Sequence, residues 1–216
     1  MGKKKYSGFT KETTEHLLLD AGAFFRGFIY TPGGENNDTF DKAVAAGKLI
    51  GATKGGGEFL ATAKLRKIEV DGAPEYTKGL ETIDSWEVYL KATVLETTAE
   101  TIKQGLGIAA VDKESDDTYY VIKGKTEIED SDYQDNVTWV GKISGSDKPV
   151  IIVVKNALST DGLKITLQDK NEATIPLTFY GHYEQDKLEE PPFEIYYPKP
   201  AAAQTATQTT TDSTKE

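Results

Sequence analysis

The 216-residue chain contains no cysteine and only two histidines. Without cysteine it has no disulfide, no thiolate nucleophile and no sulfur ligand for a metal, so its stability must come from packing and association. His16 and His182 stand far apart in the sequence and form no metal-binding motif. We therefore predict no metal site and no organic cofactor.

Long apolar segments and an excess of positive charge are also lacking. No stretch approaches the length needed to cross a bilayer, and the basic residues near the N-terminus are not followed by the apolar part of a secretory signal. The formal net charge is −10, which disfavours stable binding to DNA phosphates. We expect a protein that is made in the cytoplasm and does not use a membrane.

The most glycine-rich stretch is IGATKGGGEF, Ile50–Phe59. A phosphate-binding loop needs lysine directly after the second glycine of its frame, followed by Ser or Thr. Here Lys54 lies inside the frame, and Gly57 occupies the position of that lysine. We therefore interpret this stretch as flexible backbone that leads into a strand.

Other motifs that carry catalysis are incomplete. The glycines of Gly105–Ala110 follow a predicted helix instead of opening one, which favours a helix-ending turn over a dinucleotide site. The acidic run Asp130–Asp135 lacks the glycine and the final glutamate of a calcium loop. No nucleophile-elbow motif accompanies a serine, so a hydrolase with a spatially assembled site is only a third hypothesis. We predict no catalytic residue and no enzyme.

Alternation of apolar and polar residues predicts strands along most of the chain. In SWEVYLKATVL, every second residue from Trp86 to Val94 is apolar, so one face of this strand should be buried. The run Val150–Val154 is apolar throughout, which indicates a strand buried on both faces. Further strands are predicted at Val137–Ile143, Leu163–Gln168 and Ile175–His182. Together they indicate a mainly β fold, a two-sheet β-sandwich or barrel-like domain.

Helical signals are rare. Thr97 and Glu100 form a possible capping box, and Gly105 follows at a distance suitable for ending a short helix, so we predict one flanking helix. The parity of the apolar pattern changes within Leu65–Ile68, which predicts a bulge near Arg66 and Lys67.

Composition divides the chain into three parts. Residues 1–12 are predicted as a flexible arm, and residues 13–198 as one domain with a long loop at about 31–58. After Pro198 the sequence has no aromatic or large aliphatic residue to bury. We therefore predict that residues 199–216, rich in Thr, Ala and Gln, form a disordered tail.

Four segments, taken in order, resemble the major tail proteins of long-tailed bacteriophages. The segments are GATKGGGEF at Gly51–Phe59, KIEVDG at Lys67–Gly72, KGLETIDSWEV at Lys78–Val88 and PPFEIYYP at Pro191–Pro198. The predicted helix after the Trp86 strand also fits that order. The resemblance covers about residues 17–198, except for 112–149, and rests on the combination because no single segment is a specific signature.

This resemblance implies a structural virion protein, the subunit of a phage tail tube. Such subunits form hexameric rings that stack around a lumen, through which double-stranded DNA passes during ejection without specific binding. The implied partners are further copies of the chain, together with tape-measure, tail-terminator and baseplate proteins. The negative charge of the chain is compatible with a conduit, because an acidic wall avoids stable salt bridges to phosphates.

Within this hypothesis, the segment Phe40–Phe59 is predicted as a loop that orders against the neighbouring ring, with a mobile surface loop as the alternative. Its candidate ring-stacking residues are Ala45, Gly47, Gly51, Lys54, Gly55, Gly56 and Gly57. Charged residues on alternating strands are candidates for facing the lumen. These are Lys64, Glu69, Glu87 and Lys91.

A second hypothesis is a β-sandwich binding module, such as an adhesin or another tail component that recognises a cell surface. Loops that carry aromatic residues, such as Thr118–Tyr120, would then hold the ligand, although a strand edge explains the same tyrosines. The two hypotheses differ in assembly: a tube subunit forms rings or filaments, whereas a binding module remains a small ligand-binding unit.

Overall fold

The computed structural model describes residues 7–167 and 169–199, so the predicted tail beyond Lys199 and the first six residues of the predicted arm lie outside the described residues. The helical elements are η1 (Lys11–Glu15), α1 (Phe40–Ala45), α2 (Ala99–Leu106) and η2 (Asp130–Asp132). The strands are β1 (Leu18–Arg26), β2 (Thr53–Lys67), β3 (Glu81–Val94), β4 (Ala109–Asp112), β5 (Val121–Gly124), β6 (Gln134–Ile143), β7 (Val150–Ala157), β8 (Ile175–Tyr180) and β9 (Phe193–Tyr196).

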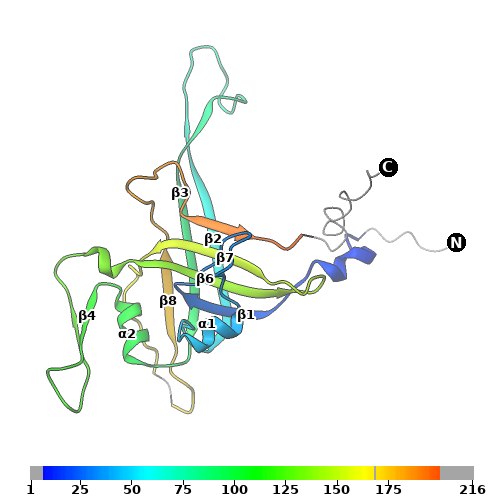
Figure 1. Ribbon diagram of the computed structural model, residues 1–216. Coiled ribbons are helices and arrows are strands. Elements are labelled where there is room, and N and C mark those ends of the chain that lie inside the picture. Colours follow the sequence, from blue (N-terminus) through cyan, green and yellow to red (C-terminus); the bar gives the residue numbers. More distant parts are fainter. Residues whose placement is uncertain (1–6, 168, 200–216) are drawn as a thin grey trace, which may run out of the picture.

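Two antiparallel sheets form the body, which confirms the predicted mainly β fold (Figure 1). One sheet has the order β1-β6-β7-β9 and the other the order β2-β3-β8, while β4 and β5 form a separate hairpin. The main core lies between the two sheets, since Phe24 and Val154 of the first sheet pack with Leu90 and Phe179 of the second. Burial of these side chains is the main force that holds the sheets together.

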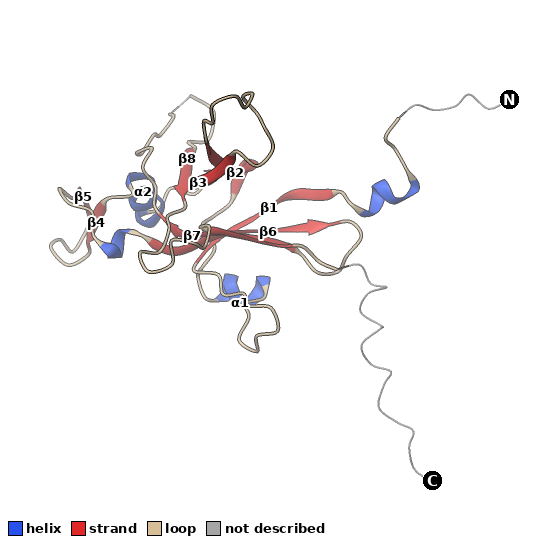
Figure 2. Ribbon diagram, turned by 90° about the horizontal axis from the view of Figure 1, so that it is seen from above, coloured by secondary structure: helices blue, strands red, loops and turns tan. Residues whose placement is uncertain are grey.

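Strand predictions based on alternation are confirmed where the strands belong to this core. In β3, Val88, Leu90, Ala92 and Val94 are buried, while Tyr89, Lys91 and Thr93 between them are only partly buried. The apolar run of β7 is covered on both faces, as predicted. Val154 belongs to the core between the sheets, whereas Ile151 and Val153 pack with Ala43 of α1 on the outer side. Figure 2 shows α1 against that outer face.

The helix predicted from Thr97 exists, but its ends differ by one to two residues. Thr98 is the N-cap, and its hydroxyl accepts a hydrogen bond from the backbone N–H of Thr101 (3.1 Å). The predicted terminator Gly105 lies inside α2, where a Cβ would meet Leu163. Gly107 ends the helix instead, because its φ of 70° is a conformation that favours glycine. The predicted capping box is therefore wrong in its residues.

Of two further local predictions, one fails and one is right in place but wrong in strand. The strand expected at Leu163–Gln168 is not formed, and its described part contributes only an isolated bridge between Thr166 and Thr174. A bulge is present next to Arg66, but on the other strand: Lys64 pairs with Ser85 and Leu65 with Ile83, so the extra residue is Asp84 of the partner strand. A shift in parity along one strand does not reveal which strand of the pair holds the extra residue.

The glycine-rich stretch is also more ordered than predicted. The region expected as a loop over Phe40–Phe59 contains all of α1 and the beginning of β2. Between Thr53 and Gly57, β2 advances four residues while β3 advances two, so Gly55 and Gly56 form a bulge with φ angles of 82° and 73°. Glycine is favoured at both positions because other residues rarely adopt these angles.

Candidate assembly site

The ladder between β2 and β3 continues well beyond the sandwich and forms a projecting hairpin (Figure 1). Its last pair joins Lys67 to Glu81, and residues 68–80 connect the strands. Strands of 15 and 14 residues are more than twice the usual length. We call residues 65–83 the hairpin tip.

Large apolar side chains of the hairpin tip are exposed to solvent. Leu65 and Ile83, which pair across the ladder, are each 55% exposed, and Tyr76 is 75% exposed. Ile68 and Val70 in the connection are also exposed. In the body, the second sheet buries one face of β3. No second sheet covers the ladder in the tip, so both of its faces are exposed there. Exposed apolar residues gathered in a projecting element are typical of an interaction surface.

The outer face of the sheet β2-β3-β8 is polar, and its charges are paired. Lys64 forms a salt bridge with Glu87 (2.9 Å between Nζ and Oε2). The hydroxyl of Tyr89 donates a hydrogen bond to Glu58 (2.6 Å), and Lys91 lies over the Tyr89 ring. The hydrogen bond to Glu58, more than any other interaction, raises the pKa of Tyr89 to about 12. This face therefore presents paired charges rather than free cations.

Three of the four lumen candidates lie together on this outer face. Lys64 is on β2, and Glu87 and Lys91 are on β3. The side chains of β3 that alternate with Glu87 and Lys91 point into the core, so these two residues point outwards. Glu69 lies in the connection of the hairpin tip, away from this face. The fold thus brings the strand candidates together and separates Glu69 from them.

The candidate ring-stacking residues do not form one protruding loop. Ala45 ends α1, and Gly47 follows it with a φ of 68°. Gly51 is buried against Val94, while Lys54 begins the bulged part of β2 and forms a salt bridge with Glu172 (3.1 Å). The remaining candidates, Gly55, Gly56 and Gly57, belong to β2 itself.

Gly57 has a role in the core. A Cβ atom at this position would lie 2.3 Å from Cζ of Phe24 and 2.2 Å from the carbonyl oxygen of Lys91. Real Cβ atoms do not approach other atoms so closely, so only glycine lets β2 pass over the Phe24 ring while remaining paired with β3. The glycine run therefore shapes the sandwich as well as the local backbone.

Both sheets have edge strands whose backbone groups are not fully paired. These are β1 and β9 in the four-stranded sheet, and β2 and β8 in the three-stranded sheet. Such edges accept strands from other chains. The β4–β5 hairpin is a second projection, and its connection carries Tyr119 and Tyr120, which are 71% and 63% exposed. These tyrosines precede β5 and remain available for the alternative binding function.

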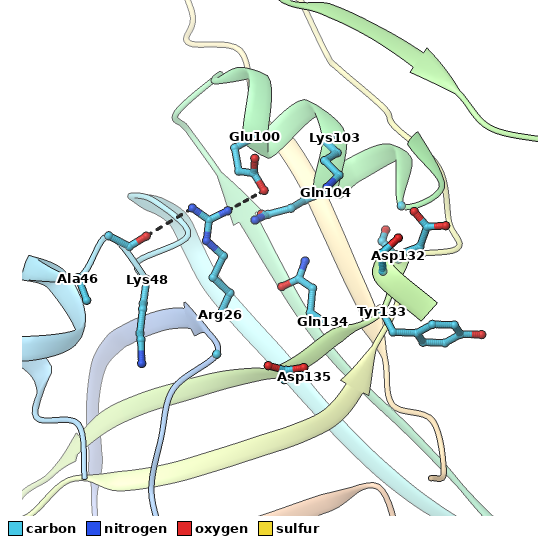
Figure 3. Close-up of a pocket in the computed structure, with 15 residues that line it drawn as sticks. Arg26, Ala46, Lys48, Glu100, Lys103, Gln104, Asp132, Tyr133, Gln134 and Asp135 are labelled. Atoms are coloured by element: carbon cyan, nitrogen blue, oxygen red, sulfur yellow. Dashed lines mark hydrogen bonds and ion pairs between the residues drawn. The ribbon is translucent and has the colours of Figure 1, made fainter. Parts of the chain in front are cut away.

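A polar pocket lies where β1, α2 and β6 converge (Figure 3). Arg26 donates to Oε1 of Glu100 (2.8 Å) and to the carbonyl oxygen of Gly47 (3.4 Å), which ties β1 to α2 and to the turn after α1. Gln104 and Gln134 each have a buried Oε1 atom without a hydrogen-bond partner. Three basic and three acidic residues line the pocket, so its charge selects neither anions nor cations. We assign no ligand to it.

Within residues 7–167 and 169–199, His, Asp and Glu side chains nowhere gather in a group suited to a metal. None of the helices in these ranges has the length and apolar character to cross a membrane. The chain matches no model of a known protein family and no curated protein.

The hairpin tip is the feature that sequence reasoning missed. The segments KIEVDG and KGLETIDSWEV were used for the resemblance, but the residues between them were not assigned to a projecting element. Part of the signal was present: alternation extends from Phe59 to Leu65 on one strand and from Trp86 to Val94 on the other, and each run is longer than a typical strand.

Proposed function

We propose that the chain is a self-assembling structural subunit of a phage tail tube. The observation that carries this proposal is the hairpin tip, which exposes Leu65, Tyr76 and Ile83 at the end of a rigid ladder. A monomer gains nothing from exposing these side chains, whereas a neighbouring copy that covers them gains apolar burial. Open edges in both sheets supply a second means of association.

The proposed rings, hexameric by resemblance, stack into a conduit for DNA in the virion. The outer face of the sheet β2-β3-β8 is suited to the lumen because Lys64 is paired with Glu87 and Lys91 lies over Tyr89. Cations engaged in this way are less available to phosphates, so DNA would pass without stable binding. Tape-measure, tail-terminator and baseplate proteins would act at the ends and in the lumen of such a tube.

Removal of the hairpin tip tests this proposal. A variant in which Asn-Gly replaces residues 65–84 joins Lys64 to Ser85, which already pair, through the turn favoured for two-residue hairpins. We expect this variant to fold, because the removed residues lie outside both core clusters. It should remain monomeric in sedimentation velocity runs under conditions in which the full chain assembles.

The β4–β5 hairpin offers a matched control. Replacing residues 113–120 by Asn-Gly joins Asp112 to Val121, which also pair, and removes Tyr119 and Tyr120. This variant should assemble as the full chain does. If it loses assembly while the variant without the hairpin tip retains it, the role given to the tip is wrong. If neither the full chain nor the control assembles and only the control loses binding to host cells, the binding-module hypothesis replaces the tube.

A further inference from the structure

The sequence contains two Asp-Gly pairs, Asp71–Gly72 and Asp161–Gly162. An aspartate followed by glycine is prone to rearrange its own backbone, because glycine has no side chain to shield its nitrogen and permits the conformations that ring closure needs. Both glycines have positive φ angles, 82° and 77°, and open space where a Cβ would lie. Sequence alone therefore gives two equal candidates for one modification.

The rearrangement needs only the chain and water. The backbone nitrogen of glycine attacks Cγ of the preceding aspartate in its acid form, and the new N–C bond closes a five-membered succinimide ring. The amide proton and the carboxyl hydroxyl leave together as one water molecule. A second water then opens the ring. Attack at the side-chain carbonyl restores aspartate, whereas attack at the backbone carbonyl gives isoaspartate, whose main chain runs through the side chain and is one carbon atom longer.

The fold restrains Asp161 from this reaction. Oδ1 of Asp161 accepts a hydrogen bond from the hydroxyl of Tyr180 (3.0 Å). The chain is also fixed on both sides of the pair, since Ser159 is 4% exposed and Leu163 packs against the main core. The carboxyl carbon of Asp161 reaches the nitrogen of Gly162 only when that hydrogen bond breaks and the flanking backbone turns.

Asp71 has no comparable restraint. It lies in the connection of the hairpin tip, outside both core clusters, and its neighbour Val70 is 51% exposed. Within residues 7–167 and 169–199, the Asp71 carboxyl has no hydrogen-bond or ion-pair partner. One backbone hydrogen bond, from the N–H of Ala73 to the carbonyl oxygen of Val70 (3.0 Å), closes the turn around the pair. Opening this turn requires little free energy, because it uncovers no side chain of the core.

We infer that Asp71, and not Asp161, converts to isoaspartate in the free subunit. The modification needs no enzyme and no partner, so it proceeds whenever the hairpin tip is exposed to water. The fold selects the site, since both aspartates are followed by glycine and differ only in what holds the carboxyl and the flanking backbone.

Conversion alters the shape of the hairpin tip. Val70 and Ala73, on either side of the pair, line one small cavity together with Ile68 and Tyr76. A main chain that is one carbon longer displaces these side chains relative to one another and moves the carboxylate. Converted subunits therefore join a growing assembly less readily, and Asp71 limits how long a free subunit stays competent. This consequence rests on the proposed self-assembly through the tip, whereas the modification itself does not.

Peptide mapping of stored protein tests the site. Trypsin releases the two pairs in separate peptides, Ile68–Lys78 and Asn156–Lys164. After storage of dilute, folded protein in warm neutral buffer, electron-transfer fragmentation should place isoaspartate at position 71. Early in storage, we expect the isoaspartate fraction there to exceed that at position 161 by about tenfold or more, the factor that corresponds to one hydrogen bond with a charged group.

Two controls separate the effect of the fold from that of the sequence. In guanidinium chloride that unfolds the chain, both pairs should convert at similar rates, because the restraint on Asp161 is gone. The variant Asp71→Glu keeps the charge but would have to close a six-membered ring, which forms far more slowly, so its tip peptide should stay unmodified. Equal conversion of the two pairs in the folded protein, or conversion at position 71 only after unfolding, would overturn the inference.

Assembly after storage tests the consequence. Stored protein is concentrated, and tubes are separated from free subunits by centrifugation. Isoaspartate should be enriched in the free fraction, and stored Asp71→Glu should assemble as well as fresh protein does. Equal isoaspartate fractions in tubes and free subunits would overturn the limit on competence but not the modified site. If fresh protein forms no tubes, the proposed function fails, while the peptide maps still decide whether Asp71 is the modified residue.

Discussion

Substituting Gly57 by alanine separates a core role of the glycine run from a role confined to assembly. The added Cβ would lie 2.2 Å from the carbonyl oxygen of Lys91 and 2.3 Å from Phe24. The oxygen belongs to the partner strand of the ladder, so it cannot move without disturbing the pairing of Gly57 with Ala92. Phe24 is 1% exposed and belongs to the main core.

The expected cost follows from these contacts. Inserting one methyl group into a well-packed region destabilises proteins by about 1–3 kcal/mol. Because one of the two obstacles is backbone, we expect Gly57→Ala to reach the upper end, about 3 kcal/mol. Gly55→Ala provides the comparison: φ at Gly55 is 82°, but nothing lies within 4 Å of its Cβ position. Backbone strain alone should cost that variant about 1 kcal/mol.

Urea unfolding followed by tryptophan fluorescence measures both values, since Trp86 and Trp139 pack against the core. The account predicts a lower midpoint for Gly57→Ala than for Gly55→Ala, at an unchanged slope. The opposite order would refute it. Equal stability of Gly57→Ala and the unmodified chain, together with lost assembly, would show that Gly57 acts only between subunits, as sequence reasoning had suggested.

Three further predictions concern polar groups. Burial would raise the pKa of Asp132, but hydrogen bonds from Lys125 and the backbone N–H of Glu129 outweigh it and lower that pKa. The resulting stabilisation is present above the ordinary value of 3.8 and is lost as pH falls through the lowered pKa. Lys125→Met should therefore destabilise the fold by about 3 kcal/mol at neutral pH, and by less in acid, as measured by urea unfolding at several pH values. Glu58→Gln should lower the pKa of Tyr89 from about 12 towards 10.0, as followed by ¹³C-tyrosine NMR. Thr98→Ala removes the N-cap of α2 and should cost about 1 kcal/mol, measured by thermal melts.

The parts of the fold that depend on burial were predictable from sequence. Alternation located the buried face of β3, and the continuous apolar run located β7 between two apolar layers. Both signals arise because the period of a strand fixes which side chains share a face. Where burial is incomplete the same signal failed: Leu163 and Leu167 alternate with polar residues, yet Leu167 is 79% exposed and no strand forms around it.

The candidate site was less predictable, because it depends on distances between strands. Sequence indicated that glycines would cluster before Phe59, but not that Gly57 passes over Phe24, 33 positions earlier in the chain. It placed Lys64, Glu87 and Lys91 on strands without showing that they share one face. The salt bridge of Lys64 with Glu87 depends on the register between β2 and β3, which the bulge at Asp84 helps to set.

Electron microscopy of the purified full chain tests the central claim most directly. Negatively stained samples, prepared over a series of rising protein concentrations, should show rings and stacked tubes with a continuous lumen. The variant with Asn-Gly in place of residues 65–84 should show neither under the same conditions. Particles of the full chain that remain single subunits at every concentration, with sedimentation coefficients equal to those of this variant, would contradict the proposal that the chain is a self-assembling tube subunit.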